Sequence, residues 1–255
     1  MSLILYKLFA ALFIFIITLI AVIYPIRARV YPSHNRILEL GDAFASGIFL
    51  GAALFHMLPD AISLFSQFTP DIHFPIAEAF CAGGFLLLLF LERLAEVSTA
   101  AKHTQKHALP YMLAIILVIH SLIEGAALGV NSTFAAASII FVAIIAHKGS
   151  ESFALAVILN RSQLTLKAVM TTIGFFAFMT PLGIALGTSL TTRIQTQTGS
   201  LITAAFDAFA AGTFLYMSTL HHINHHHSEH DSEGLLEFVV LLIGLIIMAG
   251  IAKWA

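Results

Sequence analysis

Residues 120–130 read HSLIEGAALGV, and residues 147–157 read HKGSESFALAV. Aligned without gaps, the two segments share His, Glu, Ala, Leu and Val at the same offsets. Both segments lie inside long apolar runs, where an ionisable side chain is costly and usually serves a function. This repeated pattern therefore marks both the kind of fold and the candidate functional site.

The spacing within each segment predicts how its ionisable side chains are arranged. His120 and Glu124 are four residues apart, as are His147 and Glu151. On a helix this spacing places both side chains on one face, one turn apart. Two such faces opposed would form a cage of two imidazoles and two carboxylates. That ligand set suits zinc, iron, manganese, cobalt or cadmium, and ligand type alone does not select among them.

Buried His–Glu pairs also have simpler uses. The alternatives are a hydrogen-bonded pair that only packs two helices, and a proton relay. Two pairs at matched depth favour the metal site over both. Lys148 follows His147 directly and lies three residues before Glu151, so its ammonium group can reach that carboxylate. A lysine in this position would lower the negative charge of the cage, so that a divalent ion binds less tightly. The alternatives are that the Lys148 side chain snorkels towards the membrane surface or forms a purely structural ion pair.

The composition indicates an integral membrane protein. The chain has 255 residues, of which 59% are hydrophobic and 10% are charged, whereas a soluble domain carries about 25% charged residues. The formal net charge of −2 gives no basis for nucleic-acid binding. The single cysteine, Cys81, has no partner for an internal disulfide. The first apolar run, Leu8 to Ile26, is too long for a signal peptide and is expected to be a retained span.

The apolar runs predict an all-α fold with eight transmembrane helices in one polytopic membrane domain, residues 1–255. A span needs about 20 apolar residues. The expected spans lie at roughly 4–26, 40–65, 75–94, 109–130, 134–159, 166–190, 200–221 and 235–254.

The distribution of Lys and Arg predicts the orientation. With the N-terminus outside, the inner loops hold Arg27, Arg29, Arg36, Arg93, Lys102, Lys106, Arg161 and Lys167. The outer side then holds only Lys7, Arg193 and Lys253. Both termini are therefore expected to be extracytoplasmic.

The fourth and fifth spans are consecutive, so they run antiparallel. Similar sequences in opposite orientations suggest an inverted-topology repeat, in which the binding site lies near the midplane. His120 and His147 both fall near the middle of their spans. The sequence therefore predicts pseudo-symmetric inverted repeats with the two His–Glu pairs at one depth.

Small residues and prolines mark the interiors of several spans. Three G-x-x-x-G spacings favour close helix packing, and they are formed by Gly47 and Gly51, Gly125 and Gly129, and Gly183 and Gly187. Pro59 and Pro181 lie within the second and sixth spans, where proline frees backbone carbonyls and kinks a helix.

Further ionisable residues suggest a pathway to and from the cage. His56 and Asp60 repeat the four-residue spacing in the second span, nearer its outer end, and suggest an outer station for the metal. Asp207 is a single acid in the seventh span that is expected to face a polar cavity. The segment 221–233 is a His-rich loop expected on the cytoplasmic side, where it could collect metal. Its histidines are His221, His222, His225, His226, His227 and His230.

Taken together, these segments resemble the ZIP (Zrt-/Irt-like) family of divalent-metal transporters. The fourth-span motif is similar to HS-x-x-EG, and the fifth-span motif to HK/E-G-x-x-E. HMLPDA, which contains His56 and Met57, resembles the second-span motif. TPLGIALG from Thr180 resembles the sixth-span motif, and AAGTFLYM from Ala210 the seventh-span motif. The resemblance covers essentially the whole chain.

This resemblance implies an eight-helix bundle, often a homodimer, in a plasma membrane or a bacterial inner membrane. It implies that His120, Glu124, His147 and Glu151 bind the metal between the fourth and fifth spans. It also implies that zinc, or a similar ion, moves into the cytoplasm as a transported substrate. His56, Met57, Asp60, Thr180 and Asp207 are then expected to line the pathway. The family arrangement groups spans 1, 4, 5 and 6 against spans 2, 3, 7 and 8.

The chain departs from many members of the family at two positions beside the ligands. Ser121 stands where many members have Asn, and Lys148 stands where many have a carboxylate. Members with those groups can hold two adjacent ions, whereas a lysine ammonium would occupy or repel the second. Ser121 and Lys148 are therefore expected to tune the cage toward one ion.

The resulting hypothesis is a secondary transporter rather than an enzyme, with no catalytic cofactor. The alternatives are a metal-gated channel and a membrane metal sensor. An intramembrane metalloenzyme is disfavoured because the chain contains no H-E-x-x-H sequence.

Overall fold

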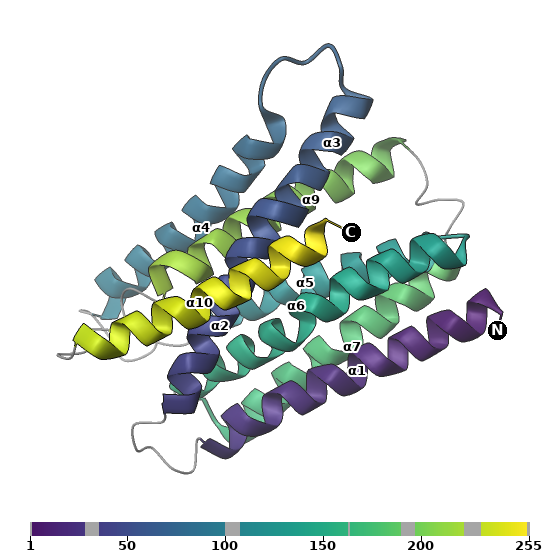
Figure 1. Ribbon diagram of the computed structural model, residues 1–255. Coiled ribbons are helices and arrows are strands. Elements are labelled where there is room, and N and C mark those ends of the chain that lie inside the picture. Colours follow the sequence, from purple (N-terminus) through teal and green to yellow (C-terminus); the bar gives the residue numbers. More distant parts are fainter. Residues whose placement is uncertain are drawn as a thin grey trace.

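The computed structural model describes residues 2–28, 36–99, 108–162, 164–189, 197–221 and 231–253. Within these ranges every regular element is a helix (Figure 1). The elements are α1 (Leu3–Ala28), α2 (Arg36–Ala52), η1 (Ala53–Met57), α3 (Leu58–Phe68), α4 (Ile76–Thr99), α5 (Ala108–Val130), α6 (Phe134–Arg161), α7 (Leu166–Ser189), α9 (Gln197–Tyr216), η2 (Met217–His221) and α10 (Asp231–Ala252). The two η elements are π-helical turns that continue the helices before them.

Among the described residues, seven helical segments are long and apolar enough to cross a membrane. They are Leu3–Ala28, Arg36–Phe68, Pro110–Val130, Phe134–Arg161, Leu166–Ser189, Gly199–Thr219 and Gly234–Ala252. The one expected span that is not among these seven is the third, at 75–94, which corresponds to α4. This helix is also long, but Glu78 near its start and Glu92 and Arg93 further along raise its charge. The expected all-α membrane bundle is confirmed.

The second membrane segment is interrupted just before Pro59. Proline has no backbone N–H, and its ring clashes with the carbonyl group four residues earlier, so a regular α-helical turn cannot form there. The chain widens into the π-helical turn η1 before continuing as α3. His56 lies on this turn, and π-helical turns of this kind are frequent at functional sites.

The packing of the helices has the pattern of an inverted repeat. The four most closely packed pairs are α5 with α7, α1 with α6, α2 with α10, and α4 with α9. In an inverted repeat, α1 corresponds to α7, α2–α3 to α9, α4 to α10, and α5 to α6. Under this correspondence the α5–α7 pair matches the α1–α6 pair, and the α2–α10 pair matches the α4–α9 pair. The same correspondence relates the two π-helical turns, η1 and η2.

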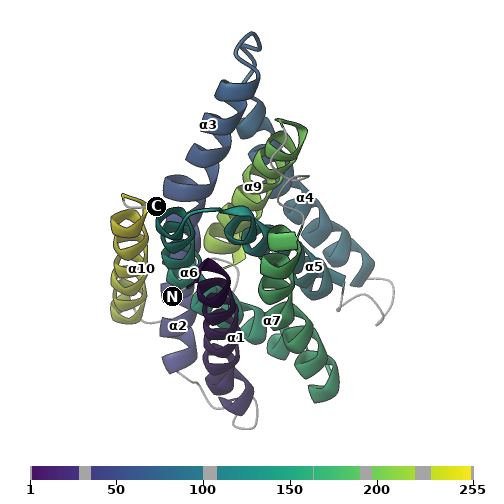
Figure 2. The same cartoon turned by 90° about the vertical axis from the view of Figure 1, so that its right-hand side faces the viewer.

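These contacts divide the helices into two groups; in the view of Figure 2, α10 and α4 lie at opposite edges of the bundle. The first group contains α1, α5, α6 and α7, and the second contains α2, α3, α4, α9 and α10. This is the division that the family resemblance implied. The main contact between the groups runs between α2 and α6. At one end of that contact, Arg161 Nη1 of α6 lies 3.2 Å from Asp42 Oδ2 of α2.

Glycines allow α5 and α7 to approach very closely. A Cβ atom on Gly125 or Gly129 of α5 would collide with the backbone of α7 at Thr180 and Ile184. The α7 glycine Gly183 would collide with α5 in the same way. The G-x-x-x-G spacings of α5 and α7 thus pack these two helices closely against each other.

Candidate metal site

The candidate site lies between α5 and α6, which a short connection makes antiparallel neighbours. Three residues separate the end of α5 at Val130 from the start of α6 at Phe134. The last of them, Thr133, caps α6 by accepting a hydrogen bond from the backbone N–H of Ala136. This tight turn brings the middle of α5 opposite the middle of α6, so the two His–Glu pairs meet.

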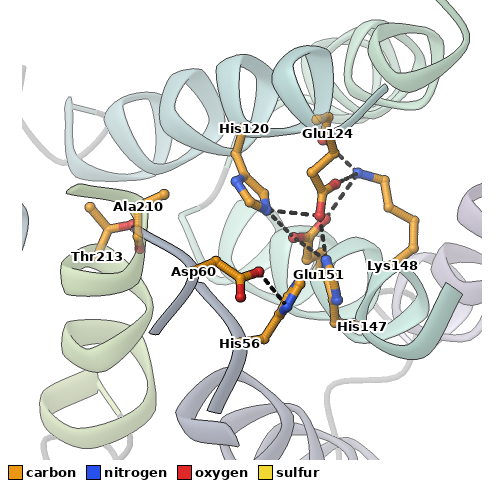
Figure 3. A network of polar contacts seen from close by, with 10 residues as sticks. His56, Asp60, His120, Glu124, His147, Lys148, Glu151, Ala210 and Thr213 are labelled. Carbon is orange, nitrogen blue, oxygen red and sulfur yellow. Dashed lines mark hydrogen bonds and ion pairs between the residues drawn. The ribbon is translucent and has the colours of Figure 1, made fainter. Parts of the chain in front are cut away.

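The four predicted ligands form one cluster (Figure 3). One ligand atom from each of His120, Glu124, His147 and Glu151 lies within 4.8 Å of all the others. His120 Nε2 is 3.0 Å from Glu124 Oε1 and 3.4 Å from Glu151 Oε1. His147 Nε2 contacts Glu124 Oε1 and lies 3.9 Å from Glu151 Oε1. Each carboxylate therefore faces both imidazoles.

The cluster is nearly closed to solvent. The side chains of His120 and His147 are 3% and 1% exposed, and that of Glu151 is 0% exposed. Glu124 is the most accessible, at 10%. Buried charges in a protein are normally paired or coordinate a metal, so this density of ionisable groups requires compensation.

Lys148 provides part of that compensation. Its ammonium group is fully buried and lies 3.0 Å from Glu151 Oε2 and 3.5 Å from Glu124 Oε2. It also donates a hydrogen bond of 2.6 Å to Ser121 Oγ. The sequence spacing predicted the contact with Glu151, and the structure adds Glu124 and Ser121.

The carboxylate oxygens are divided between the lysine and the imidazoles. The Oε2 atoms of Glu124 and Glu151 face Lys148, and their Oε1 atoms face His120 and His147. Two imidazole nitrogens and two carboxylate oxygens thus converge on one region. Four nitrogen and oxygen ligands are the usual complement of a tetrahedral zinc ion.

Several ligand atoms make no hydrogen bond within the described part of the chain. Glu151 Oε1 is buried without a hydrogen bond from the described residues. The Nδ1 atoms of His120 and His147 are likewise buried without a hydrogen-bond partner among the described residues. In most protein metal sites that nitrogen donates to a carboxylate or carbonyl group, which fixes the ring and strengthens its binding.

A cavity of about 290 Å³ leads to the cluster. It is lined by His120 and Glu124 and by four of the predicted pathway residues, which are His56, Met57, Asp60 and Asp207. His56 Nδ1 is 3.0 Å from Asp60 Oδ2, and the His56 ring centre is 6.4 Å from that of His147. The predicted pair in the second span therefore lies beside the cluster.

The remaining predicted residues lie elsewhere. Thr180 is fully buried on α7 against Gly125 and does not line this cavity. The backbone of His221 closes the turn η2. The histidines His222, His225, His226, His227 and His230 lie outside the described residues.

Three residues that the sequence did not single out surround the cluster. Phe176 of α7 lies beneath Lys148, with Nζ 4.6 Å from the ring centre. Phe214 of α9 packs edge-on against His120, at 5.3 Å between ring centres. Thr203 of α9 lines the cavity. Phe214 falls within the seventh-span motif AAGTFLYM, whereas Phe176 and Thr203 carry no sequence signal that separates them from ordinary packing residues.

Comparison with known proteins agrees with the helical membrane fold. The chain matches the sequence profile described as ZIP Zinc transporter over residues 4–111 and 98–252. It is 32% identical to zinc transporter ZIP1 of Takifugu rubripes over 267 residues, which cover 86% of each chain. It is 28% identical to zinc transporter ZIP2 of Mus musculus over 87% of each chain. It is 23% identical to zinc transporter 3 of Arabidopsis thaliana over 98% of this chain and 85% of that protein.

The family profile covers nearly the whole membrane domain, and the relatives align over most of their own length. The proteins that it resembles are named as transporters, in agreement with the prediction that this chain is not an enzyme. The chain, with its helical membrane bundle and its His–Glu cluster between α5 and α6, is therefore a member of the ZIP zinc transporter family.

Proposed function

We propose that this protein carries one divalent transition-metal ion at a time, with zinc as the preferred ion, across the cell membrane into the cytoplasm. The observation that carries the proposal is the convergence of His120, Glu124, His147 and Glu151 within 4.8 Å inside a membrane bundle. Imidazole and carboxylate ligands bind zinc well, and they also accept iron, manganese, cobalt and cadmium. The relatives are named as zinc transporters, which favours zinc among these ions.

The cavity supplies the route to the cage. It is lined by residues near the end of α5 and the start of α6, and the positive-inside distribution puts that end of the bundle outside the cell. A hydrated ion would pass Asp60, His56 and Asp207 before reaching Glu124, the most exposed cage residue. The acidic groups attract the cation, and the imidazole of His56 offers it a first nitrogen ligand.

Lys148 limits the cage to one ion. Two carboxylates and one ammonium sum to a charge of −1, since (−2) + (+1) = −1. The ammonium occupies the Oε2 side of both glutamates, where a second ion would otherwise bind. A divalent ion on the Oε1 side then meets less negative charge, so it binds less tightly and leaves more readily.

Release into the cytoplasm requires the two helix groups to change their relative position, as in alternating access. The ion pair between Arg161 and Asp42 joins the groups at the predicted cytoplasmic end. It would have to break, or move with the groups, when that end opens. The His-rich loop that follows η2 is proposed to receive the ion. The protein is proposed to act as a homodimer with both termini outside the cell.

Uptake should fall as the pH is lowered. A metal binds imidazole and carboxylate only when these groups have lost their protons, so protons compete with the metal for the same four ligands. Initial rates of zinc uptake into proteoliposomes should decrease on the acidic side of neutrality. A higher zinc concentration should restore them. A rate that is independent of pH at low zinc would contradict metal binding by these ligands.

The direct test uses proteoliposomes loaded with a zinc-sensitive dye. We expect His120→Ala and Glu151→Gln each to abolish saturable zinc uptake. The matched controls are His73→Ala and Glu78→Gln, whose side chains are exposed and lie outside the cage; these should transport normally. Unchanged uptake in the cage variants would refute the site. Uptake that rises linearly without saturation would favour a channel over a carrier.

A further inference from the structure

The aromatic ring beneath Lys148 is the feature that the proposed transport cycle leaves unexplained. Phe176 is fully buried on α7, a helix that contributes no ligand to the cage. The ammonium nitrogen of Lys148 lies 4.6 Å from the centre of its ring. A cation over the face of an aromatic ring is attracted by the ring's quadrupole, and the attraction is strongest when the pair is shielded from water.

We infer that Phe176 is a positioning residue that, together with Ser121, holds the Lys148 ammonium on the Oε2 side of the glutamates and thereby sets the affinity of the cage for the metal. The inference rests on the proposed function, because it assigns a role to a residue that acts through Lys148. Phe176 is not one of the four candidate ligands.

The argument follows from what surrounds the ammonium group. Lys148 is held by Glu124, Glu151 and Ser121, and all three distances are 3.5 Å or less. When a divalent ion binds on the Oε1 side, it withdraws negative charge from both carboxylates and repels the ammonium. The ring of Phe176 and the hydroxyl group of Ser121 are the contacts that the ion does not weaken.

The ring therefore matters more in the loaded cage than in the empty one. Without it, the ammonium would lean further onto the carboxylates and compete with the metal for them. The loaded state would lose stabilisation that the empty state keeps. Weaker metal binding is the expected consequence, and a saturated transporter should turn over no more slowly than before.

The test is a double-mutant cycle on KM for zinc uptake in proteoliposomes. In the natural chain, Phe176→Leu should raise KM about tenfold, the size expected of a buried cation–aromatic contact, and should not lower kcat. Phe176→Tyr, which keeps the ring face, should have a KM close to that of the natural chain. In a Lys148→Met background, Phe176→Leu should leave KM unchanged, because the cation that the ring positions is gone.

Two further variants keep the outcome clear. Phe176→Met replaces the ring with an apolar side chain of similar length and serves if the leucine variant does not fold. Phe85→Leu removes a ring of α4 that contacts Tyr216 rather than the cage, and its KM should not change. Equal effects of Phe176→Leu with and without Lys148, or no effect on KM, would overturn the inference. Failure of the proposed function would appear differently, as normal uptake by Glu151→Gln.

Discussion

Removing Glu151 should destabilise the protein as well as stop transport, and the two effects should be separable. Lys148 and Glu151 are both 0% exposed, and Lys148 Nζ is 3.0 Å from Glu151 Oε2. Removing one partner of a buried ion pair costs about 3–5 kcal/mol, because the other charge is left without compensation. Glu124 and Ser121 still contact Lys148, so we expect Glu151→Ala to cost about 3 kcal/mol, near the lower end of that range.

A second substitution distinguishes the lost pair from other defects. Lys148→Met removes the ammonium group that has lost its closest carboxylate, so the double variant Glu151→Ala, Lys148→Met should recover most of the lost stability. It should not recover transport, because the cage still lacks one carboxylate ligand. Unfolding by SDS in mixed micelles measures the stability, and zinc uptake into proteoliposomes measures the transport. A single variant as stable as the natural chain, or a double variant no more stable than the single one, would refute this account of Lys148.

Three further predictions follow from the cage, the cavity and the helix packing. Lys148→Met alone makes the charge of the cage more negative, so it should tighten cadmium binding, measured by calorimetry, and slow turnover. An unchanged affinity for cadmium would contradict the role given to the lysine. Asp60→Asn and Asp207→Asn should each raise KM for zinc without abolishing uptake, since both residues line the cavity and neither belongs to the cage. Complete loss of uptake would instead show that they bind the ion in its main site. Gly212→Val should destabilise the protein by about 1–3 kcal/mol, because a Cβ atom at this position of α9 collides with the Cys81 carbonyl group of α4. The control Gly250→Val has open space around its Cβ atom and should leave the stability unchanged.

The cage was predictable because its geometry is local. A four-residue spacing fixes two side chains on one helical face, and consecutive spans must run antiparallel. His120, Glu124, His147 and Glu151 therefore converge in the structure as expected. Lys148 was predictable for the same reason, since its contact with Glu151 spans three residues of one helix.

Contacts between distant segments were not predictable in this way. Arg161 and Asp42 are 119 residues apart in the chain, and nothing in either local sequence identifies the other. Phe176 lies under Lys148 because α7 packs on α5 through close glycine contacts. Its own sequence position is one apolar residue in an apolar span. Such placements depend on helix packing, which the hydrophobic pattern alone does not specify.

The π-helical turn at His56 is an intermediate case. Pro59 predicted a disturbance of the second span, because proline removes a backbone hydrogen bond and crowds the preceding turn. The sequence did not predict that the disturbance would be a widened turn carrying His56. That turn places the imidazole on the wall of the cavity, beside the cage.

The claim that one ion binds among four ligands is tested most directly by anomalous diffraction from crystals soaked in cadmium. We predict one strong anomalous peak between α5 and α6, bounded by His120, Glu124, His147 and Glu151, with the Lys148 ammonium still on the Oε2 side of the glutamates. Two fully occupied cadmium ions between these helices, or no cadmium among these four side chains, would contradict the account.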